Sequence, residues 1–158
     1  MDLLVREATF EDAELMASLT RQAWADKPAP HHCSCHETVE TVTQHLQRGG
    51  GFLLYVDDVP VGTTRWLPLD EDPCIWEIVR LGIIPAYRGH GLSQHLLEAV
   101  VHQAQVADID ELRVAVDSDQ TRLVDLYAAY SFDVAMELEY SDAAVLEPQA
   151  IVMRRELR

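Results

Sequence analysis

The feature that most constrains this chain is a glycine-containing turn between an apolar run and an amphipathic segment. The apolar run covers Cys74–Ile84, is rich in Ile and Val, and predicts a β-strand. The turn leads into a predicted helix over Gly91–Gln105, whose apolar residues recur at helical spacing: Leu92, Leu96, Leu97, Val100, Val101 and Ala104. A second β-like run follows at Leu112–Val116. Strand, helix and strand in this order predict a β-α-β unit with two parallel strands.

The residues before this unit predict two helices and three strands. In chain order these are a strand at 3–5, a helix ending near residue 24, a helix ending at the glycines 49–51, and a hairpin of strands 52–56 and 59–66. Thr9 followed by Asp12 predicts the cap of the first helix, and Ser34 followed by Glu37 predicts the cap of the second.

The residues after the unit predict a short helix and a final antiparallel pair of strands. The helix covers 123–130, and the strands cover 132–140 and 150–157. Hairpins that flank a β-α-β unit give a mixed, mostly antiparallel sheet with helices on both faces, which is an α/β (α+β) architecture. The length of 158 residues suits one domain, and we expect a single domain over 1–158.

Composition narrows the classes of function. Hydrophobic residues make up 48% of the chain, which suits a globular core, and no apolar run approaches the ~20 residues that span a bilayer. We see no secretory signal and expect a cytoplasmic protein without a membrane partner. The net charge of −15, from 27 acidic and 12 basic residues, argues against nucleic acid as a partner. It is compatible with a cationic substrate, or simply with a solvated acidic surface.

The glycine turn itself has the composition of a pyrophosphate site. Gly89 and Gly91 allow backbone N–H groups to converge on an anion at the start of a helix, and Arg88 adds a positive charge. The Gly-Lys-Ser/Thr of a Walker loop is absent. The third glycine of a dinucleotide-binding fingerprint is also missing, because Gln94 stands there.

The remaining pattern, Arg-x-x-Gly-x-Gly/Ala, is present as Arg88, Gly91 and Ser93. Together with Leu81-Gly82-Ile83 before it, this segment resembles the coenzyme A site of the GNAT family of N-acetyltransferases. Downstream, Leu123–Phe132 resembles the "LYxxxGF" helix and turn of that family. Ser93 and Ser131 depart from the pattern, which has Gly or Ala at the first position and Gly at the second. Ser93 is small and keeps its N–H, whereas Ser131 stands where a left-handed backbone is expected.

The resemblance implies acyl-CoA as co-substrate and a set of residues that bind it. These are Leu81, Gly82, Ile83, Arg88, Gly89, His90, Gly91, Leu92, Ser93, Asp117 and Tyr127. Backbone groups around Gly82 would bind the pantetheine arm and polarise the thioester carbonyl, in a place where the sheet splays. Asp117 is carried over from the end of the next strand, where many relatives have Asn.

Two side chains are candidates for acid–base chemistry. The resemblance places the phenol of Tyr127 near the sulfur, where it can donate a proton to the leaving thiolate. The alternative for Tyr127 is a tyrosine of the core. Glu77 is an acid within an apolar strand, and several relatives use a carboxylate on this strand as the base. The alternative for Glu77 is a salt bridge to Arg65 or Arg80.

A His- and Cys-rich segment, 31–36, separates the two N-terminal helices. It lacks the second ligand pair of a usual zinc site, so we expect no metal. In the resembling fold this segment lines the acceptor pocket, which makes Trp24, His36 and Glu37 candidates for acceptor contacts. The alternative is a solvent-exposed loop.

The sequence therefore predicts an N-acyltransferase that moves an acetyl group from acetyl-CoA to an amine by direct attack. The amine belongs to a small molecule or a peptide. Two alternatives stay open, namely a non-catalytic acyl-CoA-binding sensor or interaction module of the same fold, and a metal-binding regulator built on 31–36. Edge strands of this fold often pair, which leaves a homodimer as a further expectation.

Overall fold

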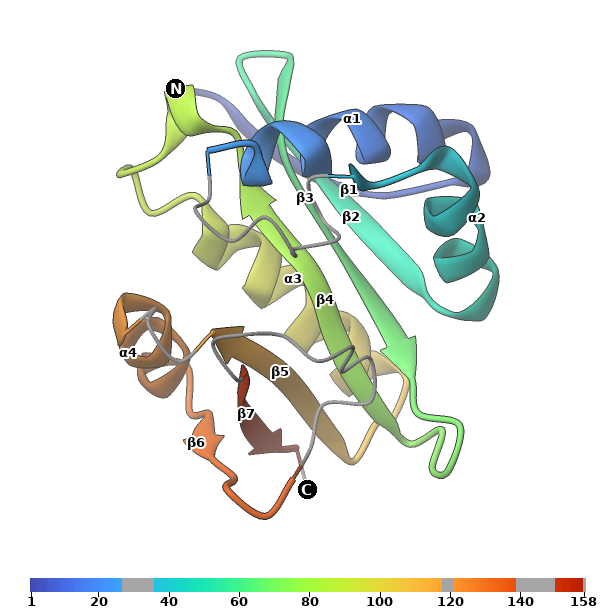
Figure 1. The fold of residues 1–158 in the computed structure, drawn as a ribbon, viewed down its shortest axis with the longest axis vertical. Helices are drawn as coiled ribbons and strands as arrows, with labels where there is room; N and C mark the ends of the chain where they lie inside the picture. The colour runs from blue at the N-terminus through green and yellow to red at the C-terminus, as the bar shows by residue number, and fades with distance from the viewer. Residues whose placement is uncertain (27–35, 118–120, 139–149, 158) are drawn as a thin grey trace.

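The computed structural model describes residues 1–26, 36–117, 121–138 and 150–157. Within these residues, seven strands form one sheet in the order β1-β2-β3-β4-β5-β7-β6 (Figure 1). The strands are β1 (Leu3–Glu7), β2 (Gly50–Val56), β3 (Val59–Pro68), β4 (Ile75–Ile83), β5 (Glu111–Asp117), β6 (Asp133–Val134) and β7 (Ala150–Glu156). The helices are α1 (Ala13–Trp24), α2 (Val39–Arg48), α3 (Ser93–Val106) and α4 (Thr121–Ala129).

Helix capping explains where the two N-terminal helices begin. Thr9 and Asp12 form the predicted capping box, and α1 follows directly. The predicted start of the second helix is wrong. Its cap is Thr38, whose hydroxyl accepts from the Thr41 N–H at 3.1 Å, so Glu37 lies before the helix. Ser34 lies outside the described residues.

The first four strands are antiparallel neighbours, with α1 and α2 between β1 and β2 and a tight turn between β2 and β3. Asp57 and Asp58 both have positive φ, at 48° and 67°, as a two-residue turn between twisted strands requires. The β-α-β unit is also confirmed, because β4 and β5 pair in parallel through the crossover helix α3. All the remaining pairs of neighbouring strands described are antiparallel.

Helices cover both faces of the sheet. The larger core lies between α3 and the sheet, and its fully buried members include Leu96, Leu97, Ile78 and Leu112. A smaller core packs α1 and α2 against the opposite face around Met16 and Val42, among others. The mixed, mostly antiparallel sheet with helices on both faces is therefore confirmed.

The C-terminal strands differ from the expectation. The strand predicted over 132–140 is reduced to Asp133–Val134, because the chain turns at Ala135, whose carbonyl accepts from the Leu138 N–H at 3.1 Å. The last strand, β7, pairs antiparallel with β5 along its full length and with β6 at two positions. No helix in the described ranges is long and apolar enough to cross a membrane.

Candidate active site

The sheet opens between its two parallel strands. The β4–β5 ladder runs from Ile75–Glu111 to Ile78–Val114 and stops there, although β4 continues to Ile83 and β5 to Asp117. Figure 1 shows the two strands diverging beyond this point. Among the described residues, the facing edges beyond Ile78 therefore carry backbone groups without ladder partners across the opening, where an extended ligand arm can bind.

The glycine turn and the start of α3 lie at the open end of β4. A short 3-10 helix, η3 (Pro85–Tyr87), leads into Gly89 and Gly91, whose φ values are +85° and +66°. A side chain would be strained at both positions, which explains the two glycines. The N-cap of α3, Leu92, makes no side-chain capping bond. The first N–H groups of α3 are thus available to an anion, and the helix dipole favours one there.

The side chain of Arg88 links this turn to the end of α1. Its Nε donates to the Ile83 carbonyl at 3.2 Å, and its Nη1 donates to the Asp26 carboxylate at 2.7 Å. Its Nη2 donates to the Ala23 carbonyl. The guanidinium was expected to contribute charge to the turn, and it also holds the turn against α1. Sequence reasoning missed Asp26, because nothing local in the sequence connects it to a residue 62 positions away.

The segment Leu81–Ile83 lies where it was expected, on β4 beside the opening. A Cβ added to Gly82 would lie 2.5 Å from Cζ3 of Trp24 and 3.0 Å from Cβ of Ala23. Gly82 is therefore required by the close approach of α1, and the Trp24 ring lies directly over the strand. Trp24 is half-buried there, so one of the three candidate acceptor contacts is adjacent to the expected thioester position.

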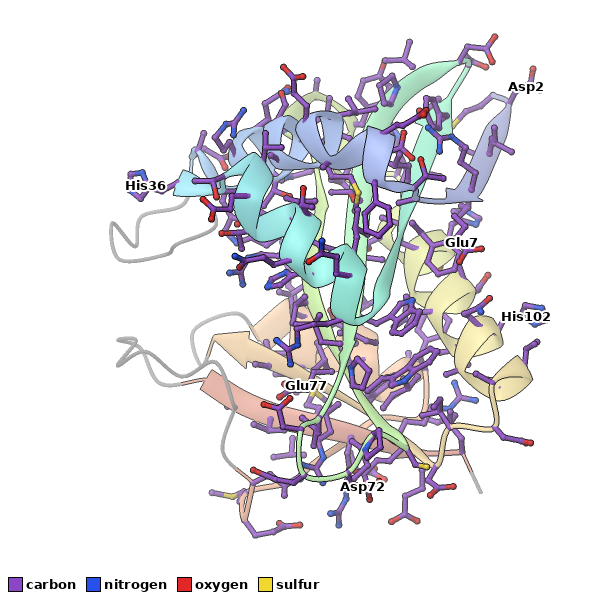
Figure 2. The ribbon with its side chains drawn as sticks, turned by 90° about the vertical axis from the view of Figure 1, so that its right-hand side faces the viewer. Asp2, Glu7, His36, Asp72, Glu77 and His102 are labelled. Carbon is purple, nitrogen blue, oxygen red and sulfur yellow. The ribbon has the colours of Figure 1, made fainter. Side chains whose placement is uncertain are left out.

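Glu77 lies at the base of the opening. It pairs in register with Arg113 of β5, one position before the ladder ends, and it is 5% exposed. Its neighbours Trp76 and Ile78 point into the core beneath α3, so Glu77 points to the face covered by α1 and α2. Figure 2 shows the Glu77 side chain on the opposite side of the sheet from the helix that carries His102.

Tyr127 is buried in the core that includes Val114 and Val116 of β5. Its ring makes an edge-to-face contact with Phe132 at a centroid distance of 5.6 Å. Burial raises the pKa of the phenol above its usual range, so the group stays protonated. Its hydroxyl makes no hydrogen bond within the described part of the chain. The phenol is therefore available as a donor.

The turn after α4 explains the position of Phe132. The Phe132 N–H donates to the Tyr127 carbonyl at 3.0 Å and the Ser131 N–H donates to the Ala128 carbonyl at 3.1 Å, which is a Schellman motif. Ser131 occupies its left-handed position, with φ of 70°. The backbone expected at this departure from the family pattern is confirmed.

The remaining candidates are not gathered in one place. His36 is exposed, and Figure 2 shows it pointing away from the body of the protein. The carboxylate of Glu37 is buried against Arg65, so acceptor contact by Glu37 would have to be indirect. His90 is exposed in the glycine turn. Asp117 ends β5, and its backbone lies at the opening.

The His- and Cys-rich segment 31–35 lies outside the described residues. Among the residues that are described, no group of three His, Cys, Asp or Glu side chains could hold a metal ion. The free thiol of Cys74 is exposed.

Sequence comparison identifies the family of the chain. Residues 13–132 match the family described as Acetyltransferase (GNAT) family. The chain is also similar to mycothiol acetyltransferase from Renibacterium salmoninarum, with 26% identity over 127 residues. That match covers 77% of this chain but only 38% of the relative.

Solved structures share the fold over almost the whole chain. The PaiA N-acetyltransferase from Thermoplasma acidophilum, solved in complex with coenzyme A, has a TM-score of 0.78 at 15% identity and covers 99% of both chains. A ribosomal-protein-alanine N-acetyltransferase from Brucella melitensis has a TM-score of 0.79 at 16% identity, covering 98% of this chain and 99% of that one.

Proposed function

This chain belongs to the GNAT acetyltransferase family, and on that premise we propose that it transfers an acetyl group from acetyl-CoA to an amine by direct attack. The observation that carries the proposal is the parting of β4 and β5 after Ile78–Val114, directly before the glycine turn and the uncapped start of α3. This arrangement supplies an opening for an extended arm next to a site for a pyrophosphate.

In this proposal, the residues of the opening bind acetyl-CoA. The N–H groups of the turn, from Gly89 to Ser93, hold the pyrophosphate. The backbone of Leu81–Ile83 hydrogen-bonds the pantetheine arm, and one N–H there polarises the thioester carbonyl. The solved relative with coenzyme A supports this co-substrate at the level of the fold.

Glu77 and Tyr127 then divide the proton transfers. Glu77 takes a proton from the incoming ammonium, directly or through water, so that the amine can attack the thioester carbon. The tetrahedral oxygen is held by the β4 N–H groups. As the C–S bond breaks, the neutral phenol of Tyr127 donates its proton to the leaving sulfur, so that coenzyme A departs as the thiol. The second proton of the attacking nitrogen, which the new amide loses, passes back to the phenolate and restores Tyr127. Its buried position supports this role because the phenol keeps its proton near neutral pH.

The acceptor belongs to the class of primary amines. One relative is named for mycothiol and one for the alanine of a ribosomal protein. A screen for the acceptor should therefore include both small amines and peptide N-termini. The net charge of −15 is compatible with a cationic acceptor.

The experiment that tests the proposal measures free thiol released from acetyl-CoA in the presence of an amine panel, with Glu77→Gln as a matched variant. We expect at least one amine to release thiol with an equivalent amount of acetylated product. Glu77→Gln should turn over more slowly. Coenzyme A binding without turnover on any amine would favour the sensor, and absence of binding would overturn the acyl-CoA function altogether.

A further inference from the structure

A cluster of charged side chains is buried between the sheet and the two N-terminal helices. Arg65 of β3 is fully buried and pairs with the carboxylate of Glu37, which is itself 3% exposed. Nε of Arg80, on β4, lies 3.7 Å from the same Glu37 carboxylate oxygen. We call Glu37, Arg65 and Arg80 the buried charge cluster.

Side chains of α1 and α2 fix the positions of Glu37 and of its partner Arg65. Arg21 of α1 donates to the backbone carbonyl of Glu37 at 2.7 Å. Arg65 also contacts the Thr20 hydroxyl at 3.4 Å and Nδ1 of His45 at 3.0 Å. One carboxylate therefore meets two guanidiniums at a point fixed by α1, α2 and β3.

Arg80 has a backbone that its residue type disfavours. Its φ is +55°, in the left-handed region that is costly for a residue with a Cβ. The strand register shows why. Thr63 pairs with Gly82 and Arg65 pairs with Val79, so Arg80 and Leu81 together face Thr64 alone. One extra residue on β4 is a β-bulge, and Arg80 lies in it.

The bulge comes directly before the segment proposed to bind the thioester. It lies past Ile78, where β4 leaves β5, and immediately before Leu81–Ile83. A bulge increases the local twist of a strand and re-aims the residues after it. The direction of the N–H groups of Leu81–Ile83 therefore depends on the conformation of Arg80.

We propose that Glu37 is a positioning residue, which draws the side chain of Arg80 to the α1–α2 face and so stabilises the bulge that aims the thioester-binding segment. The consequence for catalysis rests on the proposed function, whereas the link between Glu37 and the bulge does not. A purely structural alternative gives Glu37 the single role of neutralising Arg65.

The sharpest test compares two substitutions at one position. Arg80→Gly and Arg80→Ala both remove the guanidinium, but only glycine accepts a positive φ without strain. We expect Arg80→Gly to keep turnover within about threefold of wild type and Arg80→Ala to lose it by about 10- to 100-fold, as expected when reacting groups are misplaced. Arg80→Ala should also lose the preference for acetyl-CoA over coenzyme A, because the acetyl group then loses its contact with the strand. The ratio of the coenzyme A Kd to the acetyl-CoA Kd should therefore fall in Arg80→Ala and stay unchanged in Arg80→Gly.

A double-mutant cycle separates the two roles of Glu37. Glu37→Gln should lower turnover about tenfold in the wild-type background and less than about threefold in Arg80→Gly, where glycine supplies the bulge. Its effect on the thermal midpoint, which reflects Arg65, should be similar in both backgrounds. Equal losses for Arg80→Gly and Arg80→Ala, or equal turnover losses for Glu37→Gln in both backgrounds, would overturn the proposal.

A ligand-free readout keeps the inference separate from the proposed function. The amide resonances of Gly82 and of its cross-strand partner Thr63 report the bulge directly. We expect them to stay near their wild-type positions in Arg80→Gly and to move in Arg80→Ala and Glu37→Gln. Unmoved resonances in Arg80→Ala would refute the link even in a protein that transfers no acetyl group. Failure of the wild type to bind acetyl-CoA would refute the proposed function while these resonances still decide the inference.

Discussion

The guanidinium of Arg88 donates to the carboxylate of Asp26 at 2.7 Å, which ties the glycine turn to the end of α1. Arg88 therefore acts on coenzyme A binding mainly by holding the turn, and Asp26 offsets its charge. We predict that Arg88→Ala weakens coenzyme A binding about tenfold, equivalent to about 1.4 kcal/mol. Asp26→Asn should weaken coenzyme A binding less than Arg88→Ala does, because the bonds from Arg88 to the Ile83 and Ala23 carbonyls still hold the turn. Titration calorimetry measures both, and wild-type affinity in Arg88→Ala would contradict the role of Arg88.

Tyr127 offers a test of the general acid. Tyr127→Phe keeps the ring against Phe132, so stability and coenzyme A affinity should change little. Turnover should fall on the order of 100-fold, as for the loss of one acid–base group. Tyr130→Phe is the matched control, because its hydroxyl bonds to Gln94 and Glu98 on the surface of α3. Equal turnover in Tyr127→Phe and wild type would remove Tyr127 from the chemistry.

The stability of the protein should fall on mild acidification. Burial, followed by the charges of Arg65, Arg80 and Arg48, lowers the pKa of His45 to about 4 from 6.5. As the pH falls, His45 is therefore protonated at a higher pH in the unfolded chain than in the folded one. The contribution of neutral His45 to the free energy of unfolding is therefore complete above pH 6.5 and is lost as the pH falls toward 4.

For a half-buried ring, we expect this loss to be about 1–2 kcal/mol after allowance for solvent screening. His45→Gln should flatten the pH dependence in this window while its amide oxygen still accepts from Arg65. Denaturant unfolding at several pH values measures the slope. The ion pair of Asp12 with Arg6 acts at lower pH, because it lowers the pKa of Asp12 to about 2 from 3.8. A wild-type slope in His45→Gln would assign the acid sensitivity to another group.

Ser131 gives a prediction for stability alone. It holds φ of 70° at an exposed position, where glycine is the preferred residue. Ser131→Gly should raise the free energy of unfolding by about 0.5–1 kcal/mol, because relief of the strain exceeds the added entropy of the unfolded chain. Ser131→Ala, which keeps a Cβ, should show no such gain. A gain of the same size in Ser131→Ala would argue against backbone strain as the cause.

Local patterns were sufficient to predict most of the fold. The apolar stripe of α3, the Asp57–Asp58 turn and the Thr9–Asp12 cap each depend on neighbours in sequence, and each appears as predicted. The left-handed backbone at Ser131 followed from comparison with a family pattern. The start of the second helix was predicted too early, because Thr38 is the cap of α2. The carboxylate of Glu37 instead forms a tertiary ion pair with Arg65, which no local pattern reveals.

The candidate site was only partly predictable for the same reason. The glycine turn is contiguous in sequence, so Arg88–Ser93 could be recognised as one unit. The link from Arg88 to Asp26 spans 62 residues, and the bulge at Arg80 arises from the registration of β4 against β3. One signal for the buried charge cluster was present, because Arg65 is the single charged residue of its strand and a buried charge needs a partner.

The central claim is that the start of α3 binds the pyrophosphate of coenzyme A, and titration calorimetry on a pair of Ser93 variants tests it most directly. Ser93 is the first residue of α3, where a negative charge stabilises the free helix by about 0.3–1 kcal/mol but competes with a bound anion. We predict micromolar binding of coenzyme A by wild type and Ser93→Asn, and binding at least about tenfold weaker by Ser93→Asp, whose thermal midpoint is not lowered. Wild-type protein that does not bind coenzyme A, or equal affinities for the two variants, would contradict the account.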